Sequence, residues 1–219
     1  MSVNTVQSDN LVTKTEGRVA AVSALMFAVC LFWTVASVNV PRDASDTELL
    51  AWWQEADNLV SILVSSVFAV VAAVLFAVVV NRVLRLPAAG RAPAWLGFAR
   101  SMGAAFVATL LVTGATRGVI GHLVERLDEP LPSLDVLRYS TALNYLLLDL
   151  PVMTALALTI AAIGVVTLRT SVLPRWSAYV GLAAALVILG AVAAGIGAYA
   201  TPAALLWAVC LSAVLWRRS

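Results

Sequence analysis

Two charged side chains, Arg117 and Asp149, lie inside otherwise apolar stretches of this 219-residue chain. They are the first candidates for chemistry. A charge held in lipid or in an apolar core costs several kcal/mol unless a counter-charge, a polar group or a ligand compensates it. The two positions therefore mark an ion pair, a binding site or an acid–base centre.

Polar residues accompany these charges at the spacing of a helix face. On each of three expected helices, polar residues recur at four-residue intervals, which places them on one side of the helix. Together they could line a polar cleft. The candidate ligand-binding residues are Arg117, Asp149, Tyr145, Thr113, Thr141, Asp57 and Ser61.

Three interpretations of this constellation remain open. Arg117 lies about 25 Å along its helix from Arg100, and Asp149 about 30 Å from Arg169. Equal depth on sequential helices predicts that the two charges pair, facing the interior of the bundle. The pair could be structural, could line a ligand or ion vestibule, or could form an acid–base centre with Tyr145.

Catalytic and cofactor motifs are absent from the sequence. It contains no HExxH, no GxSxG and no glycine-rich phosphate loop. His122 is the only histidine, and Cys30 and Cys210 lie in separate apolar runs, so a zinc or haem site lacks ligands. We expect no catalytic residues, no metal and no cofactor, although the sequence leaves enzymatic activity undecided.

The elements that must position these residues are apolar helices. Hydrophobic residues make up 62% of the chain and charged residues 12%, about half the charged share of a soluble domain. Lipid is therefore the natural solvent, and a spanning helix needs roughly 20 apolar residues. The sequence predicts an all-α, polytopic bundle of six transmembrane helices in one domain, residues 17–219, after a flexible cytoplasmic arm, residues 1–16. The expected spans are 19–38, 58–81, 97–121, 139–168, 177–198 and 201–216.

Helix signals predict that the second, third and fourth helices extend beyond the membrane on its outer side. The stretch 45–48 reads Ser-Asp-Thr-Glu, a capping box that starts a helix. Neither Gly nor Pro follows until Pro87, so we expect one continuous helix with Trp52 and Trp53 in an outer cap. Pro151 is expected to kink the fourth helix.

Basic residues alternate with acidic ones from turn to turn, and this alternation predicts the orientation. Ten bases fall on one side of the expected spans and three on the other. The positive-inside rule therefore puts the N-terminus and the C-terminus in the cytoplasm. The ten are Lys14, Arg18, Arg82, Arg85, Arg91, Arg100, Arg169, Arg175, Arg217 and Arg218, and the three are Arg42, Arg126 and Arg138.

One turn carries a resemblance to a known group. The residues 173–176 read Leu-Pro-Arg-Trp and precede a Gly/Ala-rich fifth span, and Arg18 opens the first span. In these features the chain resembles six-helix bacterial membrane proteins that share a Leu-Pro-Arg-Trp turn before the fifth helix. The resemblance implies a bacterial plasma-membrane protein, and it implies no activity, catalytic residue or ligand.

Two classes of function fit the sequence. The first is a partner-binding or assembly protein that contacts the lipid bilayer and another membrane protein, and the sequence favours it slightly. The second is a small-molecule or lipid-binding protein, or a transporter, that uses an outward-facing polar cleft at Arg117 and Asp149. The basic residues are scattered, so nucleic acid is not an expected partner.

Overall fold

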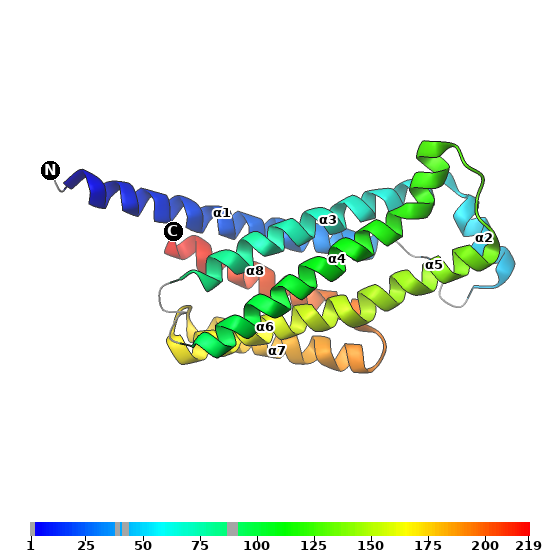
Figure 1. Ribbon diagram of the computed structural model, residues 1–219. Coiled ribbons are helices and arrows are strands. Elements are labelled where there is room, and N and C mark those ends of the chain that lie inside the picture. Colours follow the sequence, from blue (N-terminus) through cyan, green and yellow to red (C-terminus); the bar gives the residue numbers. More distant parts are fainter. Residues whose placement is uncertain (1–2, 38–39, 41–43, 87–91) are drawn as a thin grey trace.

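The computed structural model describes residues 3–37, 40, 44–86 and 92–219, and the side chains among them from residue 15 onward. Within these ranges every regular element is a helix (Figure 1). A π-helical turn, η2 (Leu148–Val152), joins α5 to α6, and a 3-10 turn, η3 (Gly197–Ala200), precedes α8. The α-helices are α1 (Val3–Ala36), α2 (Asp46–Gln54), α3 (Ala56–Leu84), α4 (Pro93–Leu127), α5 (Leu134–Leu147), α6 (Met153–Thr170), α7 (Arg175–Ala193) and α8 (Thr201–Arg218).

Six of these helices pack in a closed ring. Its order is α1, α3, α4, α6, α7, α8 and back to α1, so the first and last helices of the chain lie side by side (Figure 1). Three buried rings join neighbouring helices inside it: Phe76 lies 5.1 Å from Phe27 and 4.4 Å from Phe106, measured between ring centroids. Such tilted aromatic pairs add to the stabilisation from apolar burial.

The helices present an apolar outer surface. Large side chains such as Val67 and Leu186 are 63% and 72% exposed. Soluble proteins rarely show extended apolar patches of this kind. The structure therefore indicates a multi-pass membrane protein and confirms the predicted all-α bundle with six long apolar helices. The segments long and apolar enough to cross a membrane are Thr15–Ala36, Ala56–Leu84, Pro93–Leu127, Leu134–Thr170, Arg175–Ala193 and Gly197–Arg218.

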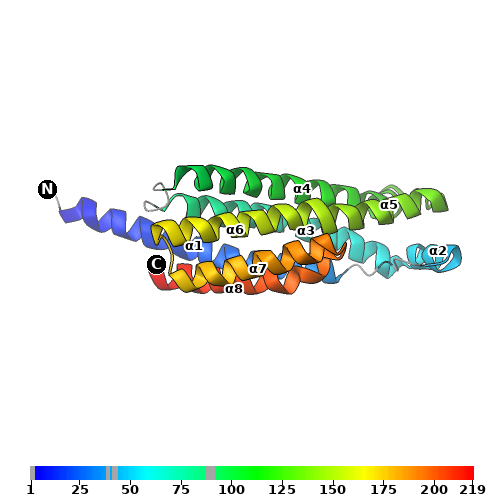
Figure 2. The ribbon, with the colours of Figure 1, turned by 90° about the horizontal axis from the view of Figure 1, so that it is seen from below.

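The two ends of the bundle differ in kind. One end carries both termini and the turn between α6 and α7 (Figure 1), and we call it the basic end because Arg82, Arg169 and Arg217 lie in the last turns of helices there. At the opposite end, the cap end, α2 and α5 reach beyond α7 and α8 (Figure 2). A separate apolar cluster holds the cap together, with Leu49, Trp53 and Leu137 in its centre.

The prediction of one continuous helix from residue 46 to the end of the second span is wrong. The capping box forms, since Ser45 N–H donates to Glu48 Oε2 at 2.8 Å. However, α2 ends at Gln54, and Glu55 is extended before α3 begins. The Asn58 amide donates to the Trp52 carbonyl at 2.9 Å and so competes with helical pairing. Because of this break, the Trp53 side chain packs inside the cap, where it is 1% exposed.

Two other boundaries differ from the prediction. The expected flexible arm is instead helical, because α1 starts at Val3 and no glycine interrupts it before Gly17. The fifth span was expected to reach residue 198, but α7 ends at Ala193. Gly195 adopts a positive φ of 74° there, a conformation open to glycine at little cost, and it redirects the chain.

Candidate functional site

Arg117 is the most deeply buried charge among the described spans. Its side chain, on α4, is 4% exposed. The guanidinium Nη1 donates to the Thr34 carbonyl of α1 and, at 2.8 Å, to Ser65 Oγ of α3. Ser65 Oγ in turn donates to the same Thr34 carbonyl at 3.0 Å. These acceptors are neutral, so they orient the guanidinium and tie three helices together without neutralising its charge.

Asp149 lies in the π-helical turn that the helix forms around Pro151. Proline lacks an N–H and cannot continue regular α-helical pairing, so a kink was expected there, and the structure has a wide turn. Asp149 is 8% exposed, and its Oδ1 accepts a hydrogen bond from the backbone N–H of Ala198 at 2.7 Å. The carboxylate therefore fastens the turn between α7 and α8 to the middle of the long α5–α6 helix.

The predicted pair between Arg117 and Asp149 is not among the hydrogen bonds described for these two side chains, and it stays a prediction. The guanidinium donates to α1 and α3, whereas the carboxylate accepts from η3 between α7 and α8. Depth along a helix follows from residue number, but the direction around the helix axis does not. The two residues lie at similar depth and serve different sides of the ring.

A cavity of about 20 Å³ lies beside Arg117, toward the cap end. This volume can hold one water-sized group. Two N–H groups of its lining residues, Arg117 Nε and Trp53 Nε1, are buried and have no hydrogen-bond partner in the described part of the chain. Buried donors of this kind call for an acceptor. The lining residues are Val40, Trp53, Ile62, Arg117, Thr141, Asn144 and Tyr145.

The structure brings three of the predicted site residues to this cavity: Arg117, Thr141 and Tyr145. The Tyr145 hydroxyl donates to the Val40 carbonyl at 2.5 Å, and Thr141 Oγ1 donates to the Leu137 carbonyl at 2.9 Å. Their hydroxyl oxygens keep lone pairs, but their protons are already used. The strongest donors that remain are therefore those of Arg117 and Trp53.

The other predicted residues do not line the cavity. Thr113 is fully buried, and its hydroxyl donates to the Thr109 carbonyl at 2.8 Å. Asp57 is exposed and Ser61 half-buried on α3, two turns and one turn, respectively, before Ser65, which contacts Arg117. Asp149 lines the η3 turn instead. The polar residues of the three helices therefore do not line one shared cleft.

Two cavity residues were missed from the sequence. Asn144 lies three residues after Thr141 and one before Tyr145, so the same helical spacing that selected those two residues could have selected it. Trp53 was assigned only to packing in the cap. Nothing in the local pattern connects it to Arg117, because its position at the same cavity depends on the break at Glu55.

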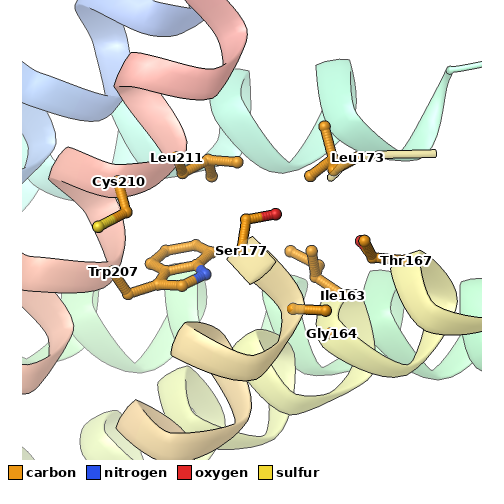
Figure 3. Close-up of a pocket in the computed structure, with 9 residues that line it drawn as sticks. Ile163, Gly164, Thr167, Leu173, Ser177, Trp207, Cys210 and Leu211 are labelled. Carbon is orange, nitrogen blue, oxygen red and sulfur yellow. The ribbon is translucent and has the colours of Figure 1, made fainter. Parts of the chain in front are cut away.

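Other candidate centres carry less chemistry. Among the described residues, no group of three or more His, Cys, Asp or Glu side chains could hold a metal ion. A second cavity, enclosed by α6, α7 and α8, gathers Trp207, Cys210 and Ser177 around a small space (Figure 3). Its volume is about 10 Å³, at the lower limit for a single water. We interpret it as a packing void.

Comparisons with known proteins add no information about this site. The chain matches no protein-family model, no curated protein and no solved structure. The Leu-Pro-Arg-Trp turn does precede α7, with Pro174 at its N-cap and Arg175 as its first residue. The resemblance to six-helix bacterial membrane proteins therefore stays a prediction, and the cavity beside Arg117 is the best-defined candidate site.

Proposed function

We propose that this multi-pass membrane protein binds a ligand with a small anionic group in the cavity beside Arg117. The observation that carries the proposal is that Arg117 and Trp53 line one cavity and that each has a buried N–H donor, Nε and Nε1, without a partner among the described residues. One of the two belongs to a permanent cation. The cavity admits one water-sized group, such as a halide or a carboxylate oxygen.

The charge of Arg117 favours an anion over a neutral acceptor. Lone pairs of the Thr34 carbonyl and of Ser65 accept from the guanidinium, but dipoles compensate a buried charge only in part. A water molecule could accept hydrogen bonds from the two N–H donors, but it would not compensate the positive charge of Arg117. An anion would accept the same hydrogen bonds, each strengthened by charge, and would complete the compensation.

The cap restricts which anions fit. The alternation of basic and acidic turns supports a topology with both termini cytoplasmic and with the extended helices on the outer side. The resemblance to six-helix bacterial membrane proteins implies that this membrane is a bacterial plasma membrane. The ligand would then enter from outside, past a surface rich in exposed acids. Like charges repel, so a monovalent ligand fits better than a multivalent one. The exposed acids of the cap are Asp46, Glu48, Glu55, Asp57, Glu125, Asp128, Glu129 and Asp135.

Thermal unfolding of the detergent-purified protein with sodium chloride or sodium acetate tests the proposal. At ten times its dissociation constant, a bound anion adds about 1.4 kcal/mol to the stability. We expect at least one salt to raise the wild-type melting temperature. We expect Arg117→Lys, which loses Nε, and Trp53→Phe, which loses only the indole N–H, to reduce that rise.

Matched controls separate binding from general salt effects. Arg126 is an exposed arginine on the same helix, and Trp52 is the neighbouring indole outside the cavity. Arg126→Lys and Trp52→Phe should respond to both salts as the wild type does. An equal response of all four variants and the wild type would refute anion binding at this cavity and would favour a bound water.

Partner binding is a second proposal, supported by an apolar side of α5. The helical stretch Leu134–Thr170 has 37 residues, or about 55 Å, against a membrane core of about 30 Å. With its basic end at one interface, α5 projects beyond the core at the other. Tyr139 and Leu146 of α5 are 70% and 57% exposed there, which is typical of a protein-binding surface.

Site-specific photo-crosslinking in cells tests the partner proposal. A photoreactive amino acid at position 139 should give a discrete protein adduct, and one at position 129, on the exposed loop of the cap, should not. Adducts with lipid alone at position 139 would contradict the proposal and would place α5 within the membrane.

A further inference from the structure

A groove runs between α3 and α4 near the basic end of the bundle, far from the Arg117 cavity. Its volume is about 490 Å³. Asn81 and Arg100 supply its polar groups, whereas Ala104, Ala108 and Leu111 lie along its apolar part. The groove is therefore amphipathic along its length, as a lipid molecule is.

The polar part of the groove lies at one interface of the expected membrane. Trp95 precedes Arg100 by about 7.5 Å along α4, and Arg169 lies 5.9 Å from the centroid of the Trp95 ring. Tryptophans paired with arginines are typical of the headgroup region. Arg100 therefore lies at the inner edge of the headgroup region, a little more than one helical turn from Trp95 along α4.

Arg100 carries an exposed charge at this depth. Its side chain faces outward, and no ion pair or hydrogen bond joins it to another side chain among the described residues. By contrast, Arg82 at the end of α3 forms an ion pair with Glu16 at 2.6 Å. A lipid-facing guanidinium needs an anionic group within reach, and the phosphate of a lipid is the anion that a bilayer supplies there.

The apolar part has the length of one leaflet. From Arg100 to Leu111, α4 rises about 16 Å, close to half of a hydrocarbon core of about 30 Å. The alanines at positions 104 and 108 are exposed and short, so the groove stays open between the helices along this length. An acyl chain whose head group lies at Arg100 would end near the middle of the bilayer.

We propose that the α3–α4 groove binds one phospholipid of net negative charge, with its phosphate at Arg100 and Asn81 and one acyl chain along Ala104 and Ala108. A net anionic head group is favoured over a zwitterionic one because Arg85, the C-cap of α3, carries an exposed positive charge at the same end of the helix as Asn81. Its positive charge attracts phosphatidylglycerol and repels the cationic choline of phosphatidylcholine. The proposal is independent of the ligand at Arg117.

Native mass spectrometry of the delipidated full-length protein tests the proposal, with dioleoyl phosphatidylglycerol and dioleoyl phosphatidylcholine as probes. We expect the wild type to bind the first lipid more tightly. Arg100→Met should weaken phosphatidylglycerol binding about tenfold, the loss expected for one charge-assisted hydrogen bond, and should remove the preference. Ala108→Trp should fill the groove and weaken the binding of both lipids.

The controls copy the same spacing onto another helix. Ala183 follows Arg175 on α7 by the same eight positions by which Ala108 follows Arg100, and both α7 residues are exposed. Arg175→Met and Ala183→Trp should bind both lipids as the wild type does. Ala104→Leu replaces the tryptophan variant if that variant does not fold. A preference that survives Arg100→Met, or binding unchanged by filling the groove, would overturn the proposal.

Discussion

Gly197 is the position where one added methyl group tests the packing of the α7–α8 turn most directly. A Cβ at this residue would lie 2.9 Å from the carbonyl carbon of Asp149 and closer still to its oxygen. Both are backbone atoms, so no change of side-chain rotamer can relieve the overlap. Gly197→Ala must therefore displace η3 from η2.

The cost follows from the two ways in which the turn can respond. If the turn stays docked, overpacking costs about 1–3 kcal/mol. If it moves away, the hydrogen bond from Ala198 N–H to the Asp149 carboxylate breaks, and a bond to a charged group contributes about 1.5–3 kcal/mol. Either way, we expect Gly197→Ala to lower the free energy of unfolding by about 1–3 kcal/mol.

Gly190 provides the matched control. It lies on α7 two turns before Gly197, and no atom lies within 4 Å of an added Cβ. Because alanine is the better helix former, Gly190→Ala should stabilise the protein by up to about 1 kcal/mol. Unfolding in detergent micelles titrated with sodium dodecyl sulfate and followed by circular dichroism measures both variants. Equal effects of the two substitutions would refute the docking of η3 on Asp149.

The remaining predictions concern two carboxylates. Asp149→Asn keeps an oxygen that accepts the hydrogen bond from Ala198, so it should lower the free energy of unfolding by only about 1 kcal/mol. Asp149→Leu loses this bond and should lower the free energy of unfolding by about 1.5–3 kcal/mol. Equal losses in the same unfolding assay would show that the charge of Asp149 itself matters. Hydrogen bonds from the backbone N–H and the hydroxyl of Ser45 hold the pKa of Glu48 below its usual 4.5. The ionised Glu48 carboxylate therefore stabilises α2 fully above pH 4.5, and this stabilisation is lost as the pH falls through the lowered pKa. Hydrogen exchange of α2 amides between pH 7 and 3 should show the loss in the wild type and no pH step in Glu48→Gln.

Much of the fold was predictable because its signals are local. Pro151 produced its irregularity where expected, and the capping box at Ser45 started α2. The candidate site was predicted only in part. Arg117, Thr141 and Tyr145 line one cavity, as their helical spacing suggested. Trp53 joins them only because the helix breaks at Glu55, and that break depends on the hydrogen bond from the Asn58 side-chain amide to the Trp52 carbonyl.

The sequence by itself determined that six apolar helices form and which charges they bury. Lipid offers no hydrogen bonds to a backbone, so each span must satisfy its own as a helix, and this requirement can be seen within 20 or so residues. Only the tertiary structure decided what each buried charge contacts. Arg117 donates a hydrogen bond to Thr34, 83 positions away in the sequence, and Asp149 accepts one from Ala198, 49 positions away. These partners follow from how the ring closes, with α1 packed against α3 and η3 packed against η2, and helical periodicity gives no direction around the ring.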